Sequence, residues 1–136
     1  MIDALLRQYP RAMVWAFGDS PTMADELAAL VIEGCKTASC CALDGLPDEE
    51  RPVVGGFNII LDGQGRPVCV TRTTALRTVP FDEVSAELAY KEGEGDRTLV
   101  HWQREHRAFF EREGCFSAQM LLLFEEFECI DIIASH

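Results

Sequence analysis

The sequence has no apolar run that approaches the roughly 20 residues of a membrane helix. Its first residues, Met1 to Asp3, lack the basic start and apolar stretch of a signal peptide. We therefore expect a cytoplasmic protein without a membrane partner. The 136 residues, of which 48% are hydrophobic and 26% charged, are typical of a globular protein and predict a single domain over residues 1–136.

Positive charge is scarce in this chain. Twelve Lys and Arg residues face 23 Asp and Glu residues, so the formal net charge is −11 at pH 7. A polyanion gains affinity by exchanging its counterions for clustered positive charge, and this balance opposes that exchange. RNA is therefore a possible but disfavoured partner, and the charge favours a small neutral ligand such as a nucleoside.

The cysteines form no C-x-x-C pair, and nothing in the sequence indicates secretion, so reduced thiols are expected rather than a disulfide framework. There are six of them: Cys35, Cys40, Cys41, Cys69, Cys115 and Cys129. A zinc site would need converging ligands, whereas His101 and His106 are five residues apart and point from different faces of a helix. The sequence thus predicts no metal and no cofactor.

Helical and extended patterns occupy separate parts of the chain. Helical patterns cover residues 2–8, 21–33, 82–90 and 97–113, with Ser20, Asp82 and Asp96 as the expected caps of the last three. Extended patterns cover residues 13–17, 37–43, 57–61, 68–74 and 121–130, and a glycine-bearing turn at 62–65 predicts an antiparallel hairpin. This order predicts an α+β fold in which three or four helices flank a curved antiparallel sheet or small barrel.

The first candidate site is the segment from Gly34 to Ser39, where the second helix ends. Lys36 and Ser39 could form a base and nucleophile pair there, because a serine needs a nearby base to accept its proton. Residues three apart on a regular strand face opposite sides, so this pair requires a bend after Gly34. The alternative interpretation is that Lys36 is a solvated cation at a helix end and Ser39 a small strand residue.

The second candidate site is the segment from Glu92 to Arg97. Glycines flank Glu94 on both sides and allow close backbone approach, which suits a carboxylate presented to a cavity as a proton carrier. Glu92 is expected to be solvated and Asp96 to cap the following helix.

Aromatic and basic residues supply further candidates for substrate binding. Trp15 and Phe17 could stack on a nucleobase, whereas Trp102 is expected in the core at its helical spacing. Three arginines lie on or near the middle strands and either bind phosphates or pair with neighbouring acids: Arg66, Arg72 and Arg77.

Four motifs together resemble the ASCH domain family. They are the segments Trp15 to Ser20, Gly34 to Ser39, Pro80 to Val84, and Glu92 to Arg97 followed by Leu99 and Trp102. The resemblance extends from about Trp15 to Ile130 and implies a PUA-like fold, a small β-barrel with helices packed around it. It also implies binding of RNA or its components.

Small bacterial members of this family hydrolyse the acetyl amide of N4-acetylcytidine, and the resemblance implies catalytic roles for Lys36, Ser39 and Glu94. Ser39 stands where those enzymes have threonine, and Cys41 stands where the motif ends in arginine. Thr37 completes the shared glycine-lysine-threonine core and is expected to bind substrate together with Trp15, Phe17 and Arg72.

The expected mechanism is attack by Ser39 on the acyl carbon, with Lys36 taking its proton. Backbone amides between Thr37 and Cys40 would hold the oxyanion. A carboxylate in contact with Lys36 would weaken it as a base, so Glu94 is expected on the opposite side of the cavity. The alternatives are an RNA-binding module without catalysis and a ribonuclease.

Overall fold

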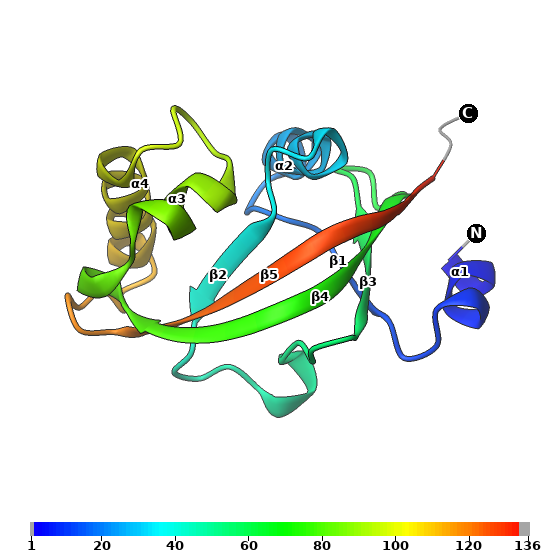
Figure 1. Cartoon of the computed structure of the whole chain (residues 1–136), viewed down its shortest axis with the longest axis horizontal. Helices are drawn as coiled ribbons and strands as arrows, with labels where there is room; N and C mark the ends of the chain where they lie inside the picture. The colour runs from blue at the N-terminus through cyan, green and yellow to red at the C-terminus, as the bar shows by residue number, and fades with distance from the viewer. Residues whose placement is uncertain (1, 134–136) are drawn as a thin grey trace.

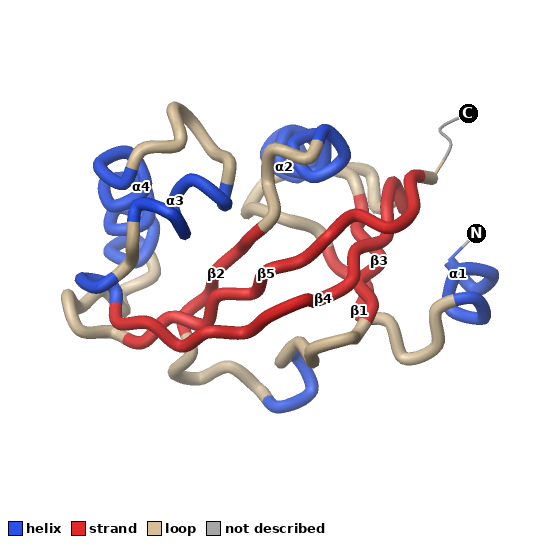
Figure 2. The backbone as a smooth tube through the Cα atoms, in the orientation of Figure 1, coloured by secondary structure: helices blue, strands red, loops and turns tan. Residues whose placement is uncertain are grey.

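A computed structural model describes residues 2–133 and shows four helices packed on a strongly curved sheet (Figures 1 and 2). The elements are α1 (Ile2–Gln8), β1 (Met13–Trp15), α2 (Pro21–Glu33), β2 (Ala38–Ala42), β3 (Phe57–Leu61), β4 (Pro67–Pro80), α3 (Ala86–Glu92), α4 (Leu99–Arg112) and β5 (Leu121–Ile132). The predicted α+β class, with helices flanking a curved sheet, is confirmed.

The five strands lie in the order β1-β3-β4-β5-β2. The hairpin predicted at residues 62–65 joins β3 and β4 in antiparallel register, but β1 pairs with β3 in parallel, so the sheet is mixed. β4 continues to Pro80, beyond the predicted end at Thr74, because β5 pairs with it along its length. Shifts in that register at Val70/Thr71 and Thr73/Ala75 are β-bulges, which bend the paired strands.

Local sequence signals explain α2 completely. Ser20 caps the helix by accepting a hydrogen bond from the Met23 amide at 3.1 Å, and Pro21 occupies the first turn. Gly34 ends the helix with a φ of 82°, a left-handed conformation that glycine adopts without steric cost. The structure confirms this predicted helix at both ends.

The predicted caps of the two later helices are wrong. Ser85 caps α3 and Thr98 caps α4, each through its side-chain oxygen. Asp82 instead lies in a short 3-10 turn, and the Asp96 carboxylate accepts hydrogen bonds from the amide and hydroxyl of Thr98. Each helix therefore starts later than predicted, because a hydroxyl closer to it satisfies its first amides.

α2 and the α3–α4 pair pack on two different hydrophobic clusters. One joins α3 and α4 to β5 and includes Trp102 and Phe124, and the other joins α2 to the opposite end of the sheet and includes Phe17 and Phe127. Figure 1 shows α2 and the α3–α4 pair over different parts of the long strands, with β2 running between them. Among residues 2–133, no helix is long and apolar enough to cross a membrane.

Gly93 ends α3 with a φ of 70°, and its lack of a side chain allows that helix to approach the segment after α2 closely. A Cβ at this position would overlap the backbone of Cys35 and Lys36. We expect Gly93→Ala to lower the free energy of unfolding by about 3 kcal/mol, from the left-handed backbone and from overpacking together.

Gly114→Ala is the matched control for this urea-denaturation measurement, because Gly114 has a φ of 74° and a Cβ added there would have no neighbour within 4 Å. Only the conformational cost of about 1–2 kcal/mol applies there. Equal losses of unfolding free energy in the two variants would show that the close approach of Gly93 to Cys35 and Lys36 does not add to the cost of the substitution.

Candidate functional site

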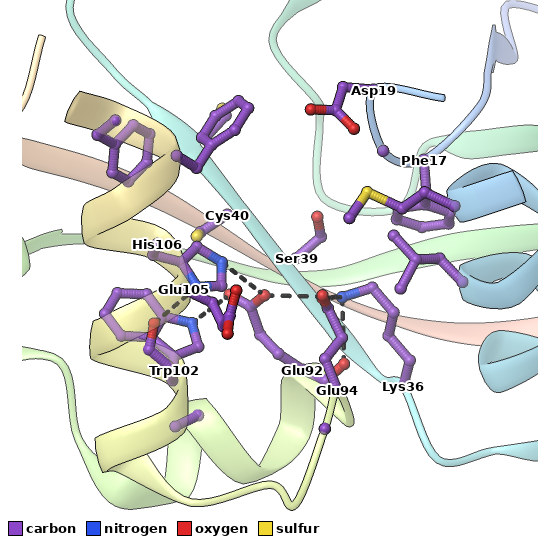
Figure 3. Close-up of a pocket in the computed structure, with 18 of the residues that line it drawn as sticks. Phe17, Asp19, Lys36, Ser39, Cys40, Glu92, Glu94, Trp102, Glu105 and His106 are labelled. Carbon is purple, nitrogen blue, oxygen red and sulfur yellow. Dashed lines mark hydrogen bonds and ion pairs between the residues drawn. The ribbon is translucent and has the colours of Figure 1, made fainter. Parts of the chain in front are cut away.

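A cavity of about 620 Å³ lies between α2 and α4, with β2 along its floor. Figure 3 shows its lining side chains converging from these three elements and from the loop after α3. They include Phe17, Leu27, Lys36, Ser39, Glu94 and His106. The cavity therefore collects residues that are far apart in the sequence.

The bend that the Lys36–Ser39 hypothesis required is present after Gly34. The amides of Cys35 and Lys36 both donate to the carbonyl of Leu30, so the chain curls back over the end of α2. The Thr37 amide then donates to the carbonyl of Lys91 at 2.7 Å, which ties the start of β2 to α3. This path carries the Lys36 side chain inward, where only 2% of the residue is exposed.

The Lys36 ammonium has two hydrogen-bond acceptors and one further ionic partner. Its Nζ donates to Oε2 of Glu94 at 2.7 Å and to the backbone carbonyl of Glu92 at 3.1 Å, and it lies 3.7 Å from Oε1 of Glu92. It also lies 5.5 Å from the centre of the Phe17 ring. A buried ammonium loses its hydration, and these contacts replace it.

The expectation that Glu94 lies across the cavity from Lys36 is wrong, since the two side chains form a close ion pair. The physical reason is the burial of Lys36, because a buried charge is tolerated only with a partner. An ammonium paired with carboxylates is a poor proton acceptor. Glu94 retains 29% exposure of its side chain and faces the cavity, so it is the better placed proton carrier.

Glu92 was expected to be solvated, and this prediction is also wrong. The residue is 2% exposed, and its Oε2 accepts a hydrogen bond from the Trp102 indole at 3.0 Å. Burial alone would raise the pKa of the Glu92 carboxyl, but the charge of Lys36 and the hydrogen bonds from His106 and Trp102 outweigh burial and lower it to about 2. Glu92 is therefore a permanent anion beneath the cavity.

His106 is the second functional residue that sequence reasoning did not identify. Its ring stacks on Trp102 at 4.3 Å, its Nδ1 donates to the carbonyl of Trp102 at 2.9 Å, and its Nε2 lies 3.4 Å from Oε1 of Glu92. Burial disfavours the charged ring, but Glu92 outweighs this effect and raises the pKa of His106 above its usual value of 6.5. The spacing of Trp102 and His106 on the buried face of the helix was the available signal.

Arg97 holds the acidic loop against the bend after α2. Its φ of 65° is left-handed, which is unusual for a residue with a side chain. Its guanidinium donates to the carbonyls of Tyr90 and Cys35, each at 3.0 Å, and lies 3.6 Å from the centre of the Tyr90 ring. The strained backbone is therefore compensated by contacts that join the two candidate segments.

The structure brings four of the predicted site residues to one cavity. Ser39 is half-buried on β2 and lines the cavity together with Lys36, Glu94 and Phe17. Figure 3 shows β2 passing behind the Lys36–Glu94 ion pair, with the hydroxyl of Ser39 directed away from the pair and toward Asp19 in this view. The four side chains share one cavity, and no hydrogen bond joins Ser39 to Lys36 in the described residues.

The other three predicted binding residues lie outside this lining. Trp15 packs edge-on against Phe17 and donates its indole hydrogen to Asn58. Thr37 is placed by its backbone contact with α3, and Arg72 is exposed on β4 opposite Glu128. The structure does not bring Trp15, Thr37 or Arg72 to the cavity, and their binding roles stay predictions.

Comparison with known proteins places this architecture in a known group. The family model described as the ASCH domain matches residues 13–131. The ASCH domain from Lactobacillus crispatus JV V101 is 30% identical, with a TM-score of 0.82 over 94% of this chain and 85% of that one. A protein from Enterococcus faecalis V583 is 36% identical, with a TM-score of 0.83 over 99% of this chain and 93% of that one.

A hypothetical protein with 18% identity and a TM-score of 0.60, covering 87% of this chain and all of that one, shows the fold alone. The comparison with curated proteins found no match. The ASCH relatives are consistent with the PUA-like architecture that the sequence motifs implied.

We expect Glu92→Gln to lower the free energy of unfolding at pH 7 by about 3 kcal/mol or more, because it removes one partner of a buried ion pair. The depressed pKa of Glu92 stabilises the folded state above pH 4.5, and this contribution is lost as the pH falls toward 2. Urea titrations between pH 5 and pH 2 should therefore show a shallower decline in the variant. The exposed Glu111→Gln is the control and should follow the unmodified protein.

The same variant should change the titration of His106. Without the Glu92 carboxylate, the lowering of the His106 pKa by burial is offset much less by nearby negative charge, and the pKa of the ring should fall. Imidazole resonances recorded by NMR across pH 5–9 measure this shift. Glu111→Gln, an exposed change on the same helix away from the cavity, should leave the His106 titration unaltered. An unchanged His106 pKa in Glu92→Gln would contradict the assigned contact.

Proposed function

Because this chain belongs to the ASCH domain family, we propose that its cavity hydrolyses the acyl amide of a small modified nucleoside such as N4-acetylcytidine. The observation that carries the proposal is the convergence of Lys36, Ser39 and Glu94 on one cavity. A hydroxyl can act as the nucleophile in acyl transfer from an amide, and a nearby carboxylate can carry its proton.

In this proposal Glu94 rather than Lys36 carries the proton, and the ion pair between them supports that choice. Ser39 Oγ attacks the acyl carbon while its proton passes to the Glu94 carboxylate. Lys36 remains an ammonium, which orients Glu94 and offsets the negative charge that develops in the transition state. This division of roles agrees with the 2.7 Å contact between Lys36 and Glu94.

The reaction consumes one water and balances in two steps. The tetrahedral intermediate collapses as the protonated Glu94 gives its proton to the leaving nitrogen, which releases the nucleoside and leaves an ester on Ser39. Glu94 then takes a proton from water, the resulting attack breaks the ester, and the proton returns to Ser39 Oγ. The products are the carboxylic acid and the unmodified nucleoside.

The free edge of β2 supplies a candidate oxyanion donor. The Leu43 amide donates to the carbonyl of Leu121, and the Phe127 amide donates to the carbonyl of Thr37. The backbone amides and carbonyls of the odd-numbered residues on this strand therefore point toward β5. The alternation of an antiparallel ladder turns the amide of Cys40 toward the open edge. This amide follows Ser39 directly and is the best placed donor for the acyl oxygen.

The negative charge of the cavity lining favours an uncharged substrate. The cavity lining includes the acids Asp19, Glu26 and Glu105 in addition to the acidic loop, and this field repels phosphate. Two of the arginines proposed to bind RNA are neutralised, since Arg66 pairs with Asp62 and Arg77 with Glu126. The non-catalytic RNA-binding alternative therefore gains no support from these contacts.

Purified protein incubated with N4-acetylcytidine should release cytidine and acetate, measured by liquid chromatography. Ser39→Ala and Glu94→Gln should each lower kcat by about 10²- to 10⁴-fold, because each removes a group that bonds to the substrate or carries its proton. Ser39→Thr should keep activity, because it preserves the hydroxyl.

Ser117→Ala, which removes an exposed hydroxyl outside the cavity, is the control and should match the unmodified protein. Full activity in Ser39→Ala would overturn the nucleophile assignment. Absence of hydrolysis in the unmodified protein, with or without longer acyl groups, would overturn the proposed function.

A further inference from the structure

A second set of functional side chains lies at the inner wall of the cavity. Donor atoms of Cys40, Glu92 and His106 all lie within 4.8 Å of one another. Figure 3 shows the Cys40 sulfur beside the His106 ring, with Glu92 between His106 and Lys36. The proposed hydrolysis uses the backbone amide of Cys40 but assigns no role to the side chains of Cys40 and His106, so this cluster calls for a separate explanation.

We propose that Cys40, Glu92 and His106 form a binding site for one zinc ion. A thiolate, an imidazole and a carboxylate are all zinc ligands, and three protein ligands with a fourth open position define the reactive type of zinc site. The open position would face the cavity. The thiol and the imidazole argue against magnesium or calcium, which prefer oxygen ligands.

The contacts behind these ligands already have the arrangement that a zinc site needs. His106 donates its Nδ1 hydrogen to the Trp102 carbonyl at 2.9 Å, which leaves Nε2 as the metal-binding nitrogen. The Trp102 indole donates to Oε2 of Glu92 at 3.0 Å, which leaves Oε1 directed at His106. Trp102 therefore orients two of the three proposed ligands.

The ligand spacing requires only a small adjustment. Zinc bonds of about 2.0–2.3 Å place tetrahedral donors within about 4 Å of one another. The present spread of up to 4.8 Å would close by side-chain movement. Zinc would replace the weak 3.4 Å contact between Nε2 and Oε1, while both contacts made by Trp102 would persist.

Zinc binding would also balance the buried charge. Lys36 and Glu94 neutralise each other as an ion pair, which leaves the negative charge of Glu92 to balance part of the charge of a divalent ion. A divalent ion bound to the Glu92 carboxylate and a Cys40 thiolate is neutral overall, with His106 uncharged. The Cys40 thiol would release its proton on binding, as zinc-bound thiols do.

Cobalt(II) titration of the metal-free full-length protein tests this proposal, because a cobalt–thiolate bond gives a charge-transfer absorption. We expect one cobalt per chain, intense visible bands of four-coordinate cobalt, and displacement by zinc. Cys40→Ser should abolish the charge-transfer band, and His106→Gln should weaken binding at least about 10-fold. Trp102→Phe should weaken binding by about 10- to 100-fold, because it releases the Glu92 ligand.

Cys41→Ser is the matched control, because Cys41 is the exposed neighbour on the same strand and should not affect the spectrum. Ser39→Ala should retain metal binding while losing hydrolysis, which separates failure of this proposal from failure of the proposed function. X-ray absorption of the zinc-loaded unmodified protein should show one sulfur ligand with nitrogen or oxygen ligands. No thiolate band, or a band that survives in Cys40→Ser, would overturn the site.

Discussion

The burial of the Lys36 ammonium is the constraint on which this site depends. A cation with 2% exposure must have anionic partners within contact distance. Glu92 at the end of α3 and Glu94 in the loop that follows provide them, more than fifty residues later in the chain. Separating them would leave an unpaired charge in a poorly solvated place, at a cost of several kcal/mol. The ion pairs therefore hold α3 and the end of α2 together.

Several backbone features follow from this constraint. Gly93 must lack a Cβ so that the acidic loop can reach the bend after α2, and Arg97 must adopt a left-handed conformation to bond with Cys35. Among residues 2–133, every buried polar side-chain atom has a hydrogen-bond partner, so the charged cluster is fully satisfied. Such a network is rigid, and it fixes Lys36, Glu92 and Glu94 relative to one another.

The elements that depend on local signals could be predicted from the sequence. Ser20, Pro21 and Gly34 specify α2 through contacts within a few residues, and the β3–β4 hairpin follows from its glycine-bearing turn. The choice between neighbouring caps could not be resolved in this way, because Asp96 and Thr98 both have the chemistry of a cap. The parallel pairing of β1 likewise depends on a distant strand.

The same limit explains which site residues were found. The motif around Lys36 and Ser39 and the glycines around Glu94 identified three cavity residues, but charge alone suggested that Glu92 is solvated. Its burial depends on the packing of α4, which brings the Trp102 indole and the His106 ring to its two oxygens. A buried tryptophan and histidine four residues apart require polar partners, and this need was the only sequence signal for Glu92.

Glu92 links the two halves of the cavity, since one carboxylate contacts both Lys36 and His106. When His106 is protonated, Glu92 is shared between two cations, and its hold on Lys36 is weakened. When His106 is neutral, Glu92 and Glu94 both act on Lys36 alone, and the contacts of the ammonium with the two carboxylates are not shared with a second cation. The charge state of His106 therefore influences how tightly Lys36 holds Glu94 in place beside the cavity.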